Sequence, residues 1–342
     1  MTPHSITKAI SLAADIARPS IMPILSNIVI GNGYVRASDS ESQVTIKTPI
    51  EGDYTVPALK FKTILATLQS DVPIKLDHKD GKLSVKCGRS KFGIQTLPTA
   101  DFPMMEIGPL VANIEISQEL LKGMLENVQH AIPSKNVNVV MNGACVSIRN
   151  NELTIAATDG ARMALQSIEF DGEDIDIIIP HSVVGRLIKF LNVGSTTIDI
   201  HDGKAVFHIG DIEYIAKLVV GKYPDFRRII PKNPNTILVD RELMLETLSR
   251  ATTVLDKVRS AKITIGRNIE ISCSNNGEVA VDDFPCQWTG EPLNLSMNPD
   301  YLRDALHAMS GDEVSLSFGD SKSAWLLEDE DGLKAVVIGL RN

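Results

Sequence analysis

The stretch YPDFRRIIP, residues Tyr223–Pro231, shows how this chain is organised. Pro224 and Pro231 fix their own backbone φ angles, and the residue before each proline is driven away from helical geometry. We therefore predict an extended connector that is neither a helix nor a central strand. Its apolar side chains need a folded body to pack against; they are Tyr223, Phe226, Ile229 and Ile230.

The connector also belongs to a repeat. A similar Asp-Phe-Pro stretch places Pro103 121 residues before Pro224, and the Asp-Gly turns at Asp80 and Asp202 are 122 residues apart. Asp320 follows Asp202 by 118 residues, which marks a third and less regular copy. We therefore predict three copies of a domain-sized unit of about 120 residues, with limits at 1–106, 107–231 and 232–342.

Each copy combines helical and strand-like patterns. Apolar residues recur at helical spacing in two segments per copy, and short alternating segments surround them. The predicted fold class is α+β, with two helices and several antiparallel strands in each copy. The predicted helices are Ile6–Ala17, Ala58–Leu68, Gln118–His130, Ser182–Leu191, Arg241–Leu255 and Pro299–Met309. The predicted strands include Asn138–Met141, Tyr214–Val220 and Lys334–Leu340.

Composition excludes several classes of protein. The 342 residues are 43% hydrophobic and 23% charged, which is ordinary for globular domains. Four scattered cysteines without a CxxC pair favour structural thiols in a reducing compartment. The amino terminus lacks a basic start and carries Asp15 within its apolar part, so we expect no signal peptide and a cytoplasmic location. No P-loop, metal-ligand cluster or catalytic pair is evident, and we expect no catalysis, metal or cofactor.

The net charge of −9 by itself argues against a nucleic-acid binder. Its distribution suggests otherwise, because basic residues lie on or beside the predicted helices while acidic runs such as 171–176 lie between strands. Each helical Lys or Arg could be the solvated face of an amphipathic helix, or together they could form a basic surface that meets phosphate. The candidates for facing DNA are Arg18, Lys60, Lys62, Lys122, Lys135, Arg186, Lys189, Arg250 and Arg303.

Four segments in order resemble the bacterial DNA polymerase III beta subunit, the family of replication sliding clamps. They are Arg18–Asn27, Gly88–Pro103, Ala157–Leu165 and His208–Pro234, and with the repeat the likeness covers essentially the whole chain. The resemblance implies that each copy is a domain with helices on an inner face. It implies a homodimer closed head to tail around double-stranded DNA, held without sequence preference. It also implies partners that include the polymerase catalytic subunit, a clamp loader, other polymerases and repair proteins.

The resemblance implies a site for a short apolar peptide of these partners, between the second and third domains. The alternative is that Met163, Ile229 and Leu340 are ordinary core residues. The matching positions are Met141, Thr158, Gly160, Ala161, Arg162, Met163, Pro224, Ile229, Val336, Ile338, Gly339, Leu340 and Arg341. The tail departs from the family pattern, and Val139 and Val140 stand where paired aromatics are expected.

The ring interface is likewise implied by the resemblance, at Phe92 and Ile94 on an edge strand, across from Val254 and Leu255. Arg89 and Lys91 could pair there with Glu278, Asp282 or Asp283, which would favour head-to-tail docking. A short amino terminus and a compressed stretch at 275–288 depart from the family. The alternatives are a hydrolase with an unrecognised site and a triplicated scaffold that does not encircle DNA.

Overall fold

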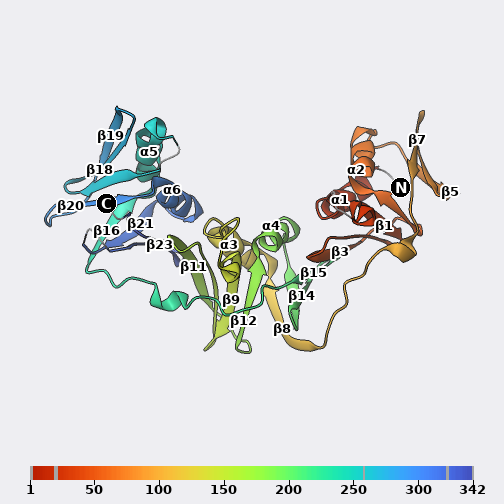
Figure 1. Ribbon diagram of the computed structural model, residues 1–342, viewed down its shortest axis with the longest axis horizontal. Coiled ribbons are helices and arrows are strands. Elements are labelled where there is room, and N and C mark those ends of the chain that lie inside the picture. The colour runs from red at the N-terminus through yellow and green to blue at the C-terminus, as the bar shows by residue number, and fades with distance from the viewer. Residues whose placement is uncertain (1–2, 19–21, 257–258, 321–322, 341–342) are drawn as a thin grey trace. The chain divides into compact units, whose positions relative to one another are not determined.

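A computed structural model describes residues 3–18, 22–256, 259–320 and 323–340 of the 342-residue chain. Helices and antiparallel strands alternate along it (Figure 1), so the predicted α+β fold class is confirmed. The chain packs as two compact units. The first unit holds residues 1–121 and 189–218, and the second holds residues 122–188 and 219–342.

Six helices lie close to the predicted positions, and local sequence explains where they begin. Asp240 accepts a hydrogen bond from the Leu243 N–H (2.8 Å), and Asn298 accepts one from the Asp300 N–H (3.0 Å), so both act as N-caps. Pro57 directly precedes its helix, where a fixed φ is tolerated. The helices are α1 (Pro3–Ala14), α2 (Ala58–Thr67), α3 (Gln118–Gln129), α4 (His181–Phe190), α5 (Arg241–Ala251) and α6 (Pro299–Ala308).

The first unit is built on an eight-stranded antiparallel sheet in the order β4-β1-β2-β3-β15-β14-β13-β8 and a three-stranded sheet in the order β5-β6-β7. Helices α1 and α2 pack against each other, and α1 also packs on β1, β2 and β3. The strands are β1 (Asn27–Gly31), β2 (Tyr34–Ser38), β3 (Ser42–Lys47), β4 (Tyr54–Pro57), β5 (Ile74–Lys79), β6 (Lys82–Cys87), β7 (Ser90–Gln95), β8 (Leu110–Ser117), β13 (Ser195–His201), β14 (Lys204–Ile209) and β15 (Ile212–Lys217).

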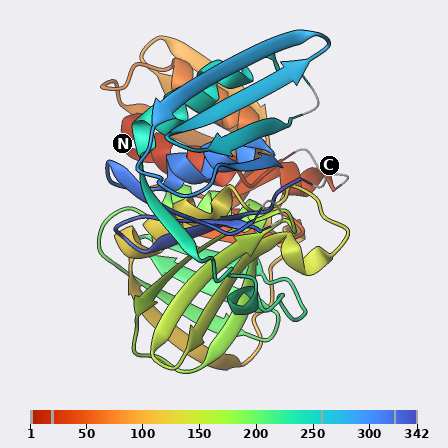
Figure 2. The same cartoon turned by 90° about the vertical axis from the view of Figure 1, so that its left-hand side faces the viewer.

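The second unit repeats this plan with an eight-stranded sheet in the order β12-β9-β10-β11-β23-β22-β21-β16 and a four-stranded sheet in the order β19-β18-β17-β20. Helix α5 lies along β18 and β19 (Figure 2) and also contacts α6. The strands are β9 (Gly143–Arg149), β10 (Glu152–Thr158), β11 (Arg162–Glu169), β12 (Ile175–Pro180), β16 (Asn235–Asp240), β17 (Ala261–Ile265), β18 (Asn268–Asn275), β19 (Glu278–Pro285), β20 (Leu293–Met297), β21 (Glu313–Phe318), β22 (Trp325–Glu328) and β23 (Leu333–Val337).

Several predicted elements need correction. The predicted strand Asn138–Met141 is wrong, because residues Val139–Met141 form a 3-10 helix. The Asn142 side chain explains the difference: its Oδ1 accepts from the Asn136 N–H (2.5 Å) and its Nδ2 donates to the Asn136 carbonyl (3.1 Å), which closes a compact loop. The strands predicted to reach Val220 and Leu340 end at Lys217 and Val337.

Helix limits and the connector also differ from expectation. Helix α5 ends at Ala251, and a 3-10 turn at Thr252–Val254 replaces the last turn of the predicted helix. Helix α1 is shifted three residues toward the amino terminus. A 3-10 turn at Phe226–Arg228 interrupts the connector, which is therefore not extended throughout.

Candidate functional site

In the second unit, the loop between β10 and β11 lies against the carboxyl-terminal segment of the chain. The Ile338 N–H donates to the Ala161 carbonyl (3.0 Å), and the Leu340 N–H donates to the Ser296 carbonyl (2.7 Å) on β20. Strand β23 pairs with β11 immediately before these contacts. The β10–β11 loop and strand β11 are therefore joined to the carboxyl-terminal segment, which is far from them in sequence.

The loop itself, Thr158–Arg162, is held by its own side chains. Thr158 Oγ1 donates to the Arg162 carbonyl (2.7 Å) and accepts from the Gly160 N–H (3.1 Å). Asp159 Oδ1 accepts from the N–H groups of Ala161 (2.8 Å) and Arg162 (3.0 Å). Gly160 has a φ of +95°, which side chains disfavour. The sequence Thr-Asp-Gly thus builds a hydrogen-bonded turn, since short polar side chains bond to the nearby backbone.

The connector packs on this part of the sheet through Tyr223 and Phe226, which gives its aromatic rings the folded body that the sequence required. The Tyr223 hydroxyl accepts from the Thr158 N–H (3.1 Å) and donates to the Gly143 carbonyl (3.4 Å). Burial raises the pKa of Tyr223 above its ordinary value. Both rings lie in a buried cluster with Cys145, Ala156, Met163, Leu165, Ile178 and Val336.

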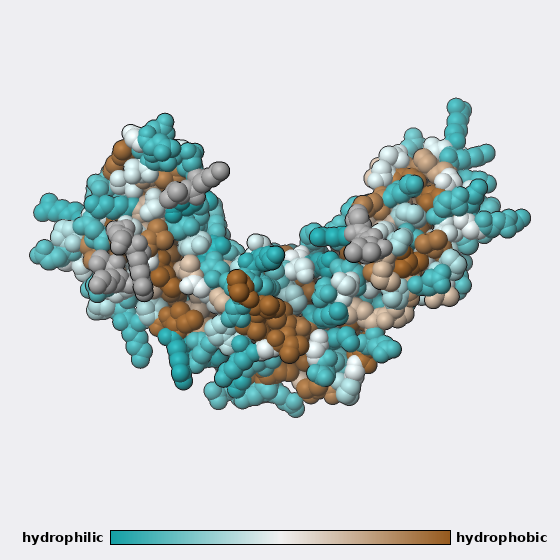
Figure 3. Space-filling model, viewed as in Figure 1, coloured by the Kyte–Doolittle hydropathy of each residue, from teal (hydrophilic) through white to brown (hydrophobic). Residues whose placement is uncertain are grey.

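Three of the predicted docking residues keep exposed apolar surface. The exposed fractions are 39% for Ile229, 42% for Ile338 and 41% for Leu340. Met163 and Val336 face each other across β11 and β23 and are buried, so they support the surface rather than form it. Figure 3 shows separate brown, apolar patches on the face along which the connector and β23 run.

The remaining docking candidates are less exposed or lie outside the described residues. Met141 is half-buried beside Gly160, where an added Cβ would come within 3.6 Å of the Met141 Cε. Pro224 and Gly339 are half-buried, and Arg341 lies outside the described residues. Val139, which the sequence marked as a departure from the family and not as a docking residue, is exposed in the 3-10 turn Val139–Met141.

Arg162 is fixed in place by residues that the sequence did not indicate. Its guanidinium pairs with Asp159 (Nε–Oδ2, 3.1 Å) and with Asp304 (Nη1–Oδ2, 2.5 Å), and it lies 4.5 Å from the centre of the Tyr301 ring. Both Asp304 and Tyr301 belong to α6, and nothing local in the sequence links that helix to the loop. Burial, and then the nearby charge of Arg162, lower the pKa of His130 to about 4.

The predicted DNA-facing residues fall into three groups. Arg18, Lys60, Lys135, Lys189 and Arg250 are exposed, and Lys62, Lys122 and Arg303 are half-buried. Arg186 is only 8% exposed, which counts against the prediction that it meets DNA, because its guanidinium has little contact with solvent.

The predicted interface residues lie at two sheet edges. Strand β7 is the edge of its three-stranded sheet and carries exposed Lys91, half-buried Phe92 and buried Ile94; Arg89, just before it, is exposed. Strand β19 is the edge of the four-stranded sheet, and the end of the α5 region beside it carries half-buried Val254 and buried Leu255.

The described part of the chain holds no group of three or more His, Cys, Asp or Glu side chains that could bind a metal ion. None of its helices is long and apolar enough to cross a membrane.

Comparison with known proteins identifies the family. Models of the N-terminal, central and C-terminal domains of the DNA polymerase III beta subunit match residues 4–106, 115–225 and 227–340. The chain is 31% identical to the beta sliding clamp of Pseudomonas putida, over 99% of this chain and 98% of that protein. It is 29% identical to the beta sliding clamp of Escherichia coli K12, over 94% and 92% of the two chains.

Solved structures agree with the sequence comparisons. A crystal structure of the DNA polymerase III subunit beta from Pseudomonas aeruginosa matches with a TM-score of 0.94 at 27% identity, over 100% of this chain and 99% of that chain. The sliding clamp of Bartonella birtlesii matches with the same score and identity over the same shares of the two chains. The resemblance drawn from the sequence is therefore confirmed, and the chain belongs to the DNA polymerase III beta subunit family, the beta sliding clamps that act as non-catalytic processivity factors of that polymerase.

Proposed function

We propose that two copies of this chain close head to tail into a ring that encircles duplex DNA and tethers the polymerase. The observation that carries the proposal is how successive copies of the repeat are joined. The first copy's β3 pairs with β15, the last strand of the second copy. The second copy's β11 pairs in the same way with β23, the last strand of the third copy.

Two strands that correspond to these junction strands have no partner strand from another copy. The third copy has β19 in the place of β3 and β11, and the first copy has β7 in the place of β15 and β23. Both are sheet edges with unpaired backbone groups, the kind of strand that joins with another chain. A head-to-tail pair of chains would use both strands twice and would make every junction between copies alike.

The repeat also predicts the register of the seam. Aligning β18 on β10 by their first buried residues puts Val279 and Val281 in the places of Met163 and Leu165. Aligning the two Asp-Gly turns puts Gly93 and Lys91 in the places of Ile215 and Glu213. The pair Met163–Val336 occupies the same place in the β11–β23 junction as the pair Gln43–Ile215 in the β3–β15 junction. At the seam, Val279 takes the place of Met163 and Gly93 the place of Ile215, so Val279 should lie opposite Gly93. Because the strands are antiparallel, Val281 should then lie opposite Lys91.

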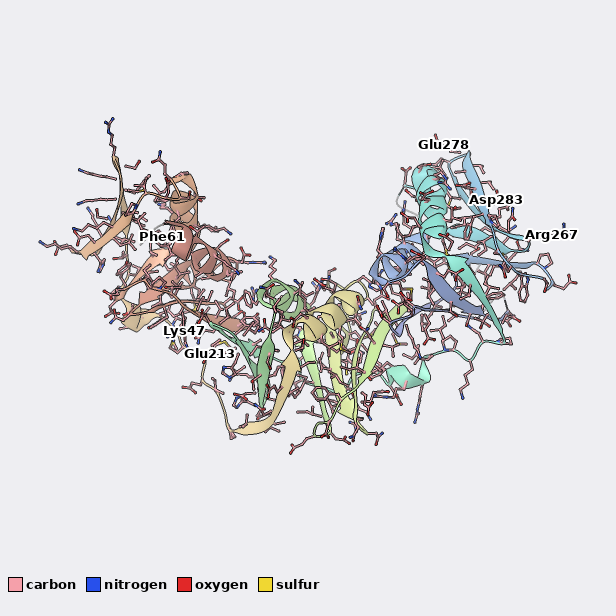
Figure 4. The ribbon with its side chains drawn as sticks, turned by 180° about the vertical axis from the view of Figure 1, so that it is seen from behind. Lys47, Phe61, Glu213, Arg267, Glu278 and Asp283 are labelled. Carbon is pink, nitrogen blue, oxygen red and sulfur yellow. The ribbon has the colours of Figure 1, made fainter. Side chains whose placement is uncertain are left out.

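This register agrees with burial and charge. Val279 and Val281 are exposed side chains on one face of β19, and Lys91 is exposed on β7. Ala280 and Phe92, which would be opposed on the other face, are both half-buried. The same register sets Asp283 opposite Arg89, a cross-strand pair of opposite charge. Figure 4 shows Glu278 and Asp283 along β19, the acidic side of the proposed seam.

The second part of the proposal concerns DNA. The basic residues on and beside the helices would face phosphates without reading sequence, and retention would come from the closed ring. Support comes from the exposure of Arg18, Lys60 and Lys135 and from the helix positions of Lys122 and Arg303. Arg186 is left out of this surface because it is buried.

The third part is a docking site for apolar peptides of the polymerase, the clamp loader and repair proteins. It is supported by exposed Ile229, Ile338 and Leu340 and by the hydrogen bond that joins Ile338 to the loop Thr158–Arg162. Covering the exposed part of one such side chain yields about 1 kcal/mol, and fully burying an apolar anchor of the peptide yields about 1.5–3 kcal/mol, enough for exchangeable binding. The proposal also places the domain limits at residues 106 and 231. It places the protein in the cytoplasm, which agrees with four cysteines that are free thiols.

An engineered disulfide tests the ring. A Val281→Cys, Lys91→Cys variant should oxidise to a covalent dimer of twice 37.2 kDa, because directly opposed residues have Cα atoms within disulfide range. The control variant Val279→Cys, Lys91→Cys sets the same residue types diagonally, about 7–8 Å apart, and should stay unlinked. Equal cross-linking of both variants would refute the register. No cross-linking of either, together with a monomer in sedimentation, would favour a scaffold that forms no ring.

A further inference from the structure

Asp15, directly after α1, lies between two lysines from other helices. Its Oδ1 is 3.2 Å from Lys62 Nζ on α2, and its Oδ2 is 3.4 Å from Lys189 Nζ on α4. Partial burial raises the pKa of Asp15, but the hydrogen bond and charge of Lys62, and then those of Lys189, outweigh it and lower the pKa overall. The carboxylate is therefore ionised at neutral pH and engages both ammonium groups.

Carboxylate partners of basic residues on helices recur in the second unit. Arg250 on α5 pairs with Glu246 (Nη1–Oε2, 3.2 Å) and with Asp282 on β19. Arg303 on α6 pairs with Asp300 (Nη2–Oδ1, 2.7 Å), which also binds Arg259. Four cations that would face DNA thus have a carboxylate partner, although isolated surface ion pairs add little to stability. A gain in stability is therefore a weak explanation for this recurrence.

We propose that Asp15 is a positioning residue that holds Lys62 and Lys189 back from the DNA phosphates and so weakens the grip of the ring on DNA. The inference rests on the proposed function, because it requires these helices to face the duplex. A cation that reaches a phosphate releases a counterion and adds to affinity, and the clamp must break each such contact to move. A carboxylate that keeps two lysines engaged reduces the number of contacts without removing the positive charge that attracts DNA.

Asp15→Asn tests the idea by releasing both lysines while keeping the shape of the side chain. In equilibrium binding of a fluorescent duplex, the slope of log affinity against log salt should steepen by about 0.9 for each lysine that reaches phosphate. If both lysines are released, the ratio of the variant's affinity for DNA to the wild-type affinity should fall about twelvefold between 50 and 200 mM salt. Loaded Asp15→Asn clamps should also diffuse more slowly along DNA.

Two controls separate the effect of the Asp15 carboxylate at its position from the effect of net charge. Asp15→Glu keeps the carboxylate and should retain the wild-type salt slope. Asp171→Asn makes the same change in net charge in the acidic run between β11 and β12, outside the helices, and should leave the slope unchanged. A slope change shared by Asp171→Asn and Asp15→Asn would overturn the proposal, since net charge alone would then explain it.

A second variant keeps the test decisive if Asp15→Asn does not fold. Lys62→Gln with Lys189→Gln should lower the salt slope by less than about 0.9, because the wild-type lysines are already engaged. A loss near 1.8 would mean that both lysines bind phosphate freely, and would overturn the inference. If wild-type protein loads on circular DNA while Asp15→Asn behaves as wild type in salt slope and diffusion, only the role of Asp15 fails. If wild type does not load, the proposed function fails with it.

Discussion

Replacing Tyr223 by Phe should loosen the connector and destabilise the second unit. The change deletes the hydroxyl that accepts from the Thr158 N–H (3.1 Å), and Thr158 is itself buried. A buried donor left without a partner costs about 1–3 kcal/mol. The lost bond to the Gly143 carbonyl is long at 3.4 Å and adds little. The ring and its contacts with Met163 and Val336 remain, so the hydrogen-bond loss is isolated from packing.

Scanning calorimetry measures the effect, because a unit of this size loses about 2–4 °C of Tm for each kcal/mol. Tyr54→Phe is the matched control. Tyr54 is also buried, but its hydroxyl has no hydrogen-bond partner in the described part of the chain. Removing that hydroxyl should leave Tm unchanged or raise it. Equal losses for the two variants, or a Tyr223→Phe loss below about 0.5 kcal/mol, would refute this account of the connector.

Three further predictions concern the seam, acid and docking. Arg89→Asp should weaken the dimer by setting two like charges opposite each other, and adding Asp283→Arg should restore it; sedimentation equilibrium that shows no recovery in the double variant would contradict the register. Burial lowers the pKa of His130 to about 4 in the folded chain, against about 6.5 in the unfolded chain, so between these pH values only the unfolded chain gains a proton. The free energy of unfolding should therefore fall by up to roughly 3 kcal/mol as pH drops from 6.5 to 4. His130→Gln should flatten the dependence of Tm on pH in this range, and an unchanged slope would assign the loss to other groups. Leu340→Ser removes an apolar side chain that is 41% exposed and that a bound peptide would cover, which contributes about 1 kcal/mol to binding. In calorimetric titration the variant should bind a polymerase-tail peptide about fivefold more weakly, with dimerisation intact. Unchanged affinity would remove Leu340 from the docking site.

The sequence predicted the helices well because their signals are local. Pro57, Asp240 and Asn298 mark helix starts by φ restriction or capping, and these effects act within a few residues. The strand predicted at Asn138–Met141 failed because the β-branched pair Val139 and Val140 favours a strand by propensity alone. The Asn142 side chain bonds to the Asn136 backbone instead, and no periodicity rule contains that contact.

Only part of the candidate site could be predicted from the sequence. The Thr-Asp-Gly turn follows from its residues, and the other docking residues came from the resemblance to the clamp family. The partners of Arg162 could not be predicted, because Asp304 lies 142 residues further along the chain and is brought close by packing of α6. Burial of Arg186 was also beyond prediction, since its helix presents basic residues to both solvent and core.

The most direct test of the account loads the protein onto nicked circular DNA with a clamp loader and then cuts the circle. A closed ring that holds DNA without gripping it should stay on the circle in high salt and leave once ends are available. Retention on the linear DNA, or equal loss from circular and linear DNA, would contradict topological encirclement.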